Sequence, residues 1–349
     1  MNMSRKNEEK LVVDIINSKL TNNDRKNPLF SIAEELASEI KKDFNKINGC
    51  EYIGDDFSDR ADILLLTPQK EYVELKVITS SKSGKGTLAN TSQDIFSEYN
   101  LLNGVMGWSK WRKENSYEQK VLSILNDNLK YTESEKKYIL NNEKVIDKNS
   151  EIEIKARILR FKIQTFSKKQ KIKFKSLPSF IKKFNSNAGT RKNASEEVII
   201  ILKTCERIIE HARNDLRGYL DYCAKKEIDK KQFLKFVILL KSGFHTIPLI
   251  NNNINLSLEK IKTLADNYRI YYYYTKRTTG DHIKKETAMK IKEYYPKNVN
   301  DLKVVFENEG LWVFNKEKKI MHMKFHWRNV FFGIAVPSVE IFDRLVNHI

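Results

Sequence analysis

The chain has 349 residues, with 63 Lys and Arg against 45 Asp and Glu, so its formal net charge at pH 7 is +18. This length excludes a minimal peptide scaffold and suits two ordinary domains, or one large α/β core with an added recognition part. A hydrophobic content of 40% is enough to bury a core and argues against wholesale disorder.

The basic excess lies in the C-terminal part of the chain. Residues 1–150 carry 23 Lys and Arg against 24 Asp and Glu, whereas residues 151–349 carry 40 against 21, a net charge of +19. Such an excess on a folded surface attracts polyanions, and nucleic acid is the commonest polyanion that a protein binds over a large area. A membrane surface or an acidic protein would also fit this charge.

The cysteine content and the apolar runs indicate in which cellular compartment the protein is expected. The three cysteines form no closely spaced pair, which indicates neither a disulfide framework nor a cysteine zinc site. The longest apolar runs are short and flanked by charge, and the N-terminus lacks the apolar stretch of a signal peptide. We therefore expect a cytoplasmic protein with no membrane partner.

The N-terminal part predicts a helix, three strands and a second helix, in that order. Apolar residues recur at helical spacing from Pro28 to Phe44, and three short segments rich in strand formers follow. A polar loop at Ser80–Thr87 then precedes a second amphipathic segment. The strands are expected at Cys50–Ile53, Ala61–Leu66 and Tyr72–Ile78, and the second helix at Ser92–Leu102.

The C-terminal part predicts mixed α and β structure. An exposed connector or a charged helix at Glu133–Ser150 places the expected domain boundary, with a core at 1–135 and a basic region at 150–349. The expected strands are Ile152–Phe166, Tyr268–Lys276 and a strand-rich tail from Leu302 to Phe342, and the expected helices are Glu196–Lys226, Lys230–Leu240 and Leu256–Asp266.

The candidate catalytic residues lie in the second and third expected strands, within the segment RADILLLTPQKEYVELKV. If a three-residue loop is centred on Pro68, residues equidistant from it pair across the two strands. Asp62 then lies opposite Glu74, on the same face as Lys76. A loop of two or four residues would shift this register and turn Asp62 to the other side.

This set of residues suits phosphodiester cleavage. The carboxylates of Asp62 and Glu74 and the peptide carbonyl of Leu75 are oxygen ligands that Mg²⁺ prefers, and they leave room for water and a phosphate oxygen. Lys76 would orient the attacking water and stabilise the growing negative charge. The alternative is that these side chains lie on the solvated face of a strand and have no catalytic role.

At these residues the sequence resembles the PD-(D/E)xK nuclease superfamily. The resemblance consists of Asp62, eleven intervening residues and the triplet Glu74–Lys76, set in the element order predicted above, and it covers roughly residues 28–105. Ala61 stands where the family's name has a proline. The resemblance implies an α/β restriction-endonuclease-like core, a mixed central sheet flanked by helices, with a basic, mixed α+β region for DNA recognition. It also implies Mg²⁺ at Asp62 and Glu74, and Lys76 beside the attacking water.

Two further positions of the family pattern have candidates here. Members often place a Glu from the first helix near the metal, and Glu34, Glu35 and Glu39 compete for this role, with Glu35 preferred. Many members also carry a Gln on the helix after the E-x-K strand, which Gln93 matches.

Several segments are candidates for contact with DNA. The loop SSKSGKGT departs from a nucleotide-binding P-loop and suits a basic contact with the DNA backbone, or a plain solvated turn. Residues 151–200 hold 13 Lys and Arg against 4 Asp and Glu, and the segment HWRN contains residue types that read base edges. The candidates are Lys82, Lys85, Lys168, Lys169, Lys171, Lys173, Arg328 and Asn329.

Two other patterns favour packing over binding. His322 and His326 have no third metal ligand close in sequence. The run Tyr271–Tyr274 must point to both sides of a strand, so at least half of it is expected to pack.

The sequence therefore predicts a Mg²⁺-dependent endonuclease that cuts double-stranded DNA, of the type II restriction kind. Cutting both strands needs two cores, so a homodimer is expected at least on DNA. A repair or structure-specific nuclease of the same fold, and a non-catalytic nucleic-acid-binding protein, are the alternatives.

Overall fold

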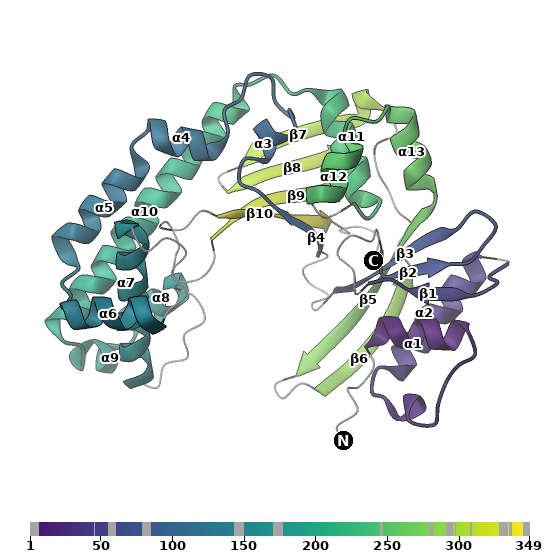
Figure 1. Ribbon diagram of the computed structural model, residues 1–349, viewed down its shortest axis with the longest axis horizontal. Coiled ribbons are helices and arrows are strands. Elements are labelled where there is room, and N and C mark those ends of the chain that lie inside the picture. The colour runs from purple at the N-terminus through teal and green to yellow at the C-terminus, as the bar shows by residue number, and fades with distance from the viewer. Residues whose placement is uncertain are drawn as a thin grey trace.

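The computed structural model describes residues 7–44, 46–54, 61–78, 85–142, 150–169, 177–244, 247–278, 282–290, 296, 298–307, 309–327, 334 and 337–344. The described chain is α/β, as predicted, and has an arched outline (Figure 1). A group of helices forms one end of the arch, a sheet with two helices forms the other, and a second sheet lies between them.

The first sheet joins strands from distant parts of the chain. Its order is β1-β2-β3-β5-β6, in which β3 and β5 run parallel and the other neighbours antiparallel. The strands are β1 (Cys50–Tyr52), β2 (Ile63–Leu65), β3 (Glu71–Ile78), β5 (Tyr268–Thr278) and β6 (His282–Lys290).

Two N-terminal helices, α1 (Glu8–Ile16) and α2 (Phe30–Asp43), pack against this sheet (Figure 1). Their buried apolar residues share one core with Val73 and Leu75 of β3. Tyr271 of β5 joins the same core, and its hydroxyl donates a hydrogen bond of 2.5 Å to Asp43 Oδ2. Burial is the main cause that raises the pKa of Tyr271. At least this member of the tyrosine run therefore packs, as predicted.

The second sheet is antiparallel throughout, in the order β4-β10-β9-β8-β7. It too combines early and late segments, because β4 pairs with β10. The predicted boundary at 135–150 thus does not separate the sheets, since each contains strands from both sides of it. The strands are β4 (Lys85–Thr91), β7 (Leu302–Glu307), β8 (Gly310–Asn315), β9 (Lys318–His326) and β10 (Ser338–Arg344), and the short helix η2 (Val299–Asp301) precedes β7.

Most of the remaining helices share one hydrophobic core with the second sheet, whereas the described residues of α9 are exposed. Trp108 connects the helices with this sheet, because its ring stacks on Tyr219 with 5.8 Å between centroids and meets the ring of Phe325 edge-on at 5.0 Å. The remaining helices are α3 (Ile95–Glu98), α4 (Trp108–Glu114), α5 (Tyr117–Asn128), α6 (Glu133–Asn142), α7 (Glu151–Lys169), α8 (Leu177–Ser186), α9 (Ala188–Lys192), α10 (Glu196–Ala224), α11 (Lys230–Lys241), α12 (Ile247–Asn253) and α13 (Leu258–Asp266); η1 (Asp24–Lys26) lies between α1 and α2.

The structure corrects three expected elements. The strand predicted at Ile152–Phe166 is helix α7, in which ion pairs four residues apart, such as Glu151 with Lys155 at 2.6 Å, support the helical backbone. Its acidic first turn and basic last turn also suit the helix dipole. Lys85–Thr87 belongs to β4 and not to a loop, and the helix predicted at Ser92–Leu102 is the single turn α3.

The other helices and strands of the C-terminal part are confirmed. In α11, the Asp229 side chain accepts a hydrogen bond of 2.9 Å from the amide of Gln232, as expected for an N-cap. Within the described residues, no helix combines the length and the apolar character needed to cross a bilayer.

We predict that Gly310→Ala destabilises the protein strongly. A Cβ at this position would lie 1.9 Å from the carbonyl oxygen of Met323, so the β8–β9 pairing would have to open. Overpacking of this kind costs about 1–3 kcal/mol, and urea unfolding would show it. The control is Gly189→Ala in α9, where the nearest atom is at 3.4 Å and alanine is expected to be neutral or stabilising. Equal urea midpoints for the two variants would contradict the steric role assigned to Gly310.

Candidate active site

The hairpin of β2 and β3 has the register that the sequence predicts. Ile63 pairs with Val73, and Leu65 pairs with Glu71, so residues equidistant from Pro68 lie opposite one another. The backbone of Lys70 has a φ of 52°, which reverses the chain at the end of the loop. Because this register places Ile63, Leu65 and Val73 in the core, a slip of one residue would expose all three.

Asp62 and Glu74 come together at the end of this hairpin. One carboxylate oxygen of Asp62, Oδ2, accepts a hydrogen bond of 2.8 Å from the backbone amide of Leu75. Glu74 precedes that amide and is 2% exposed. Its neighbour on the other side is Ile270 of the parallel strand β5. The carboxylate of Asp62 is therefore held beside the strand that carries Glu74.

A third carboxylate reaches this place from Glu9 in the first turn of α1. The Asn7 side chain caps the helix by accepting a hydrogen bond of 3.0 Å from the amide of Lys10, and Asn7 Nδ2 donates one of 2.9 Å to Glu9 Oε2. The Tyr52 hydroxyl donates another of 3.2 Å to the same oxygen. Glu9 is thus held by its own helix cap and by β1.

The electrostatics show that these three carboxylates interact. Burial raises the pKa of Glu9 to about 7, and the negative charges of Asp62 and Glu74 add to this effect. We call Glu9, Asp62 and Glu74 the carboxylate cluster. A Cβ at Gly54 would lie 3.2 Å from Asp62 Oδ1 and 3.0 Å from the Tyr52 hydroxyl, so the chain passes close to the cluster at a residue without a side chain.

Two accessory residues proposed from the family pattern lie differently from the expectation. Glu35 is exposed on α2, and the acid that acts on Asp62 and Glu74 is Glu9 of the preceding helix. Gln93, between β4 and α3, donates hydrogen bonds to Ser109 Oγ of α4 at 2.7 Å and to Asp94 at 3.2 Å.

The sequence contains a signal for Glu9 that lies outside the family pattern. The segment NEEKLVVDII combines an N-cap asparagine with apolar residues at helical spacing, which is typical of a helix with an acidic first turn. Which of its two glutamates turns towards Asp62 depends on how α1 packs on the sheet, and this contact is not encoded locally.

The other predicted site residues are placed as follows. The backbone of Lys76 lies in β3, and its side chain is outside the described part of the structure, as is that of Lys85 in β4. Lys168 and Lys169 are exposed in the last turn of α7. Lys82, Lys171, Lys173, Arg328 and Asn329 lie outside the described residues.

The oxygen atoms of Asp62, Glu74 and the Leu75 carbonyl suit a cation that needs few protein ligands. Among the described side chains, no three acidic, histidine or cysteine groups surround a common point closely enough to form a closed metal site. Mg²⁺ keeps several waters and takes one or two carboxylates from the protein, so Asp62 and Glu74 with the carbonyl of Leu75 fit this ion. The raised pKa of Glu9 shows where a positive charge would relieve repulsion.

His322 lies in a different setting, with its ring stacked on that of Trp312 at 4.2 Å. This stacking supports the packing interpretation of that histidine.

Comparison with protein-family models, curated proteins and solved structures gave no match. The family resemblance of the Asp62 to Lys76 segment therefore stays a prediction from its residues.

We predict that Glu9→Gln removes part of the pH dependence of stability. The pKa of Glu9 is about 7 in the folded protein, against 4.5 for an ordinary glutamate, so the folded state binds this proton more tightly. The resulting stabilisation is present below about pH 4.5 and is lost as the pH rises through about 7. Urea unfolding without divalent cations, at about pH 5 and about pH 8, would measure the loss in the wild type and its reduction in the variant.

The control is Glu51→Gln, because Glu51 is an exposed glutamate on β1 that does not raise the pKa of Glu9, whereas the charge of Glu8 does. If Glu51→Gln flattened the pH dependence as much as Glu9→Gln does, the crowding of Glu9 by the other carboxylates would be disproved.

Proposed function

We propose that this chain is a metal-dependent endonuclease that hydrolyses phosphodiester bonds in double-stranded DNA, of the type II restriction kind. The observation that supports it is the carboxylate cluster: three acids from α1, the start of β2 and β3 are held together although their charges repel. A hard divalent cation takes carboxylate oxygens as ligands, and buried, mutually repelling carboxylates are typical of functional sites.

Each member of the cluster has a distinct role in this proposal. Asp62 and Glu74 would hold Mg²⁺, and the Leu75 amide orients Asp62 by occupying one of its oxygens. The bound ion would screen the negative charge of the phosphate and lower the pKa of a water ligand. Glu9, which Asn7 and Tyr52 hold near Asp62 and Glu74, would accept a proton from the attacking water. Lys76 keeps the role that the sequence assigns to it, stabilisation of the developing charge.

The charge distribution supports DNA as the substrate. Residues 151–349 carry a net charge of +19, and a large basic surface raises the local concentration of a polyanion. Cleavage of both strands would require two copies of the site, so the proposal includes a homodimer on DNA.

We predict that Glu74→Gln and Asp62→Asn each abolish cleavage of plasmid DNA in Mg²⁺. Both changes keep the shape of the side chain and remove one charge, and a decrease of roughly 10²–10³-fold or more is the scale expected when one transition-state interaction is removed. DNA binding in EDTA should persist in both variants. Glu51→Gln is the control, since Glu51 is an exposed glutamate on β1 of the same sheet.

Normal cleavage by Glu74→Gln would remove that residue from the catalytic machinery. If the wild type bound DNA in EDTA but cut neither DNA nor RNA in Mg²⁺ or Mn²⁺, the non-catalytic alternative would replace the nuclease.

We also predict that a long duplex is cut into discrete fragments. A restriction enzyme reads a fixed base sequence, so its products have defined lengths on a gel. A smear, or a preference for branched or single-stranded DNA, would favour the repair or structure-specific nuclease instead.

A further inference from the structure

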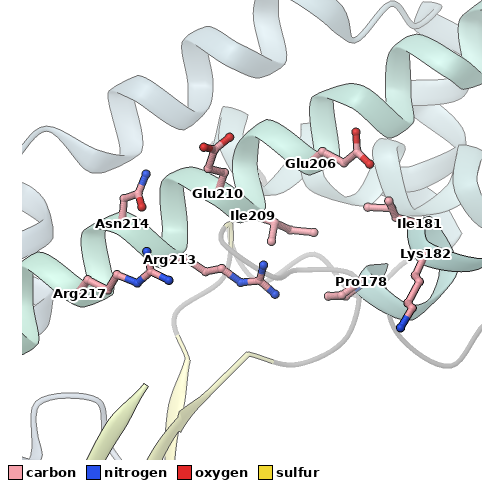
Figure 2. Close-up of a pocket in the computed structure, with 9 residues that line it drawn as sticks. All are labelled: Pro178, Ile181, Lys182, Glu206, Ile209, Glu210, Arg213, Asn214 and Arg217. Atoms are coloured by element: carbon pink, nitrogen blue, oxygen red, sulfur yellow. The ribbon is translucent and has the colours of Figure 1, made fainter. Parts of the chain in front are cut away.

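A hollow of about 560 Å³ lies between α8 and α10, in the helical end of the molecule (Figure 2). Its apolar lining comes from Pro178, Ile181 and Ile209. The polar residues that line it are Lys182, Arg213, Arg217, Asn214, Glu206 and Glu210. The carboxylate cluster belongs to the sheet at the other end of the arch, so this hollow is a separate feature (Figure 1).

Three cationic side chains, two from α10 and one from α8, line the hollow. Arg213 and Arg217 are four residues apart, which places them on one helix face with a rise of about 6 Å between them. Lys182 reaches the same hollow from α8. In Figure 2 the three charged ends follow one another on one side of α10, and the carboxylates of Glu206 and Glu210 point to the other side.

The row is exposed, and the charges of two of its members are not neutralised by a described acidic residue. Lys182 and Arg217 are exposed and form no ion pair within the described part of the chain. Glu206, which also lines the hollow, accepts a hydrogen bond of 2.8 Å from Asn185. Arg213 and Arg217 are like charges one helical turn apart, which disfavours the helix slightly.

We infer that this hollow binds the phosphodiester backbone of the DNA duplex, away from the site of cleavage. A linear row of cations beside an apolar lining matches successive phosphates on one DNA strand. A site for a single small anion would instead have cations that converge on one point. The inference rests on the proposed function, because it names a place where the substrate is held.

The test compares two double variants that each remove two positive charges. Lys182→Gln with Arg217→Gln changes the hollow. Lys230→Gln with Lys260→Gln is the control, on exposed residues of α11 and α13 beside the second sheet. Arg213 stays unchanged, because its charge already acts on Glu309, whose pKa is lowered mainly by a hydrogen bond from Lys324. Unfolding midpoints in urea would confirm that all proteins are folded.

The measurement is the affinity for a fluorescent synthetic duplex in EDTA, as a function of NaCl concentration. The slope of log K against log [NaCl] falls by roughly 0.9 for each phosphate that is no longer neutralised, so we expect a change of about 1 to 2 for the hollow variant and less for the control. An equal change in both variants, or no change in either, would overturn the inference. Weaker binding of inorganic pyrophosphate with an unchanged duplex slope would overturn it too, in favour of a small-anion site.

This readout is independent of cleavage. If the protein never cuts DNA but the hollow variant shows the reduced slope, the DNA-binding surface is supported and the nuclease proposal is refuted. If the protein cuts DNA and both variants show equal slopes, the nuclease proposal is supported and the DNA-binding surface is refuted.

Discussion

The β2–β3 hairpin can adopt only one register that keeps its apolar side chains inside, and this constraint positions the acids. Ile63 and Val73 face α1 and α2, so the residues that precede and follow them in the pairing must meet at the end of the hairpin. Asp62 and Glu74 occupy those positions. Their proximity thus follows from hydrophobic burial a few residues away, and the hydrogen bond from the Leu75 amide then orients Asp62.

Bringing Glu9 to the same place is unfavourable in the absence of a cation. A half-buried carboxylate next to two others remains protonated up to about pH 7, as the raised pKa of Glu9 indicates. Interactions with Asn7 and Tyr52 hold it there despite this cost. A cation bound beside Asp62 and Glu74 would offset part of this cost, which is the physical content of the nuclease proposal.

The site was predictable from sequence where it depends on local pairing, and unpredictable where it depends on packing. Alternation placed Asp62 opposite Glu74 once a three-residue loop centred on Pro68 was assumed, and the observed register has this loop. Glu9 belongs to a helix whose existence is readable from its cap, but whose rotation against the sheet is a tertiary contact. Similarly, the apolar residues of Ile152–Phe166 fit both the spacing of a strand and the spacing of a helix. The ion pairs between residues four apart, which favour helix α7, become evident only when the two spacings are compared.

The parallel pairing of β3 with β5 has the widest consequence for how the chain works. The strand that carries Glu74 is flanked on one side by β2, nearby in sequence, and on the other by a strand nearly two hundred residues later. Tyr271 of that later strand packs under α2 and bonds to Asp43, so the N-terminal core is completed by the basic part of the chain. A core ending at residue 135 would leave the edge of β3 unpaired and its apolar face partly open. The acidic site therefore depends on a strand from the C-terminal part of the chain, and its position is fixed only when that strand has paired with β3.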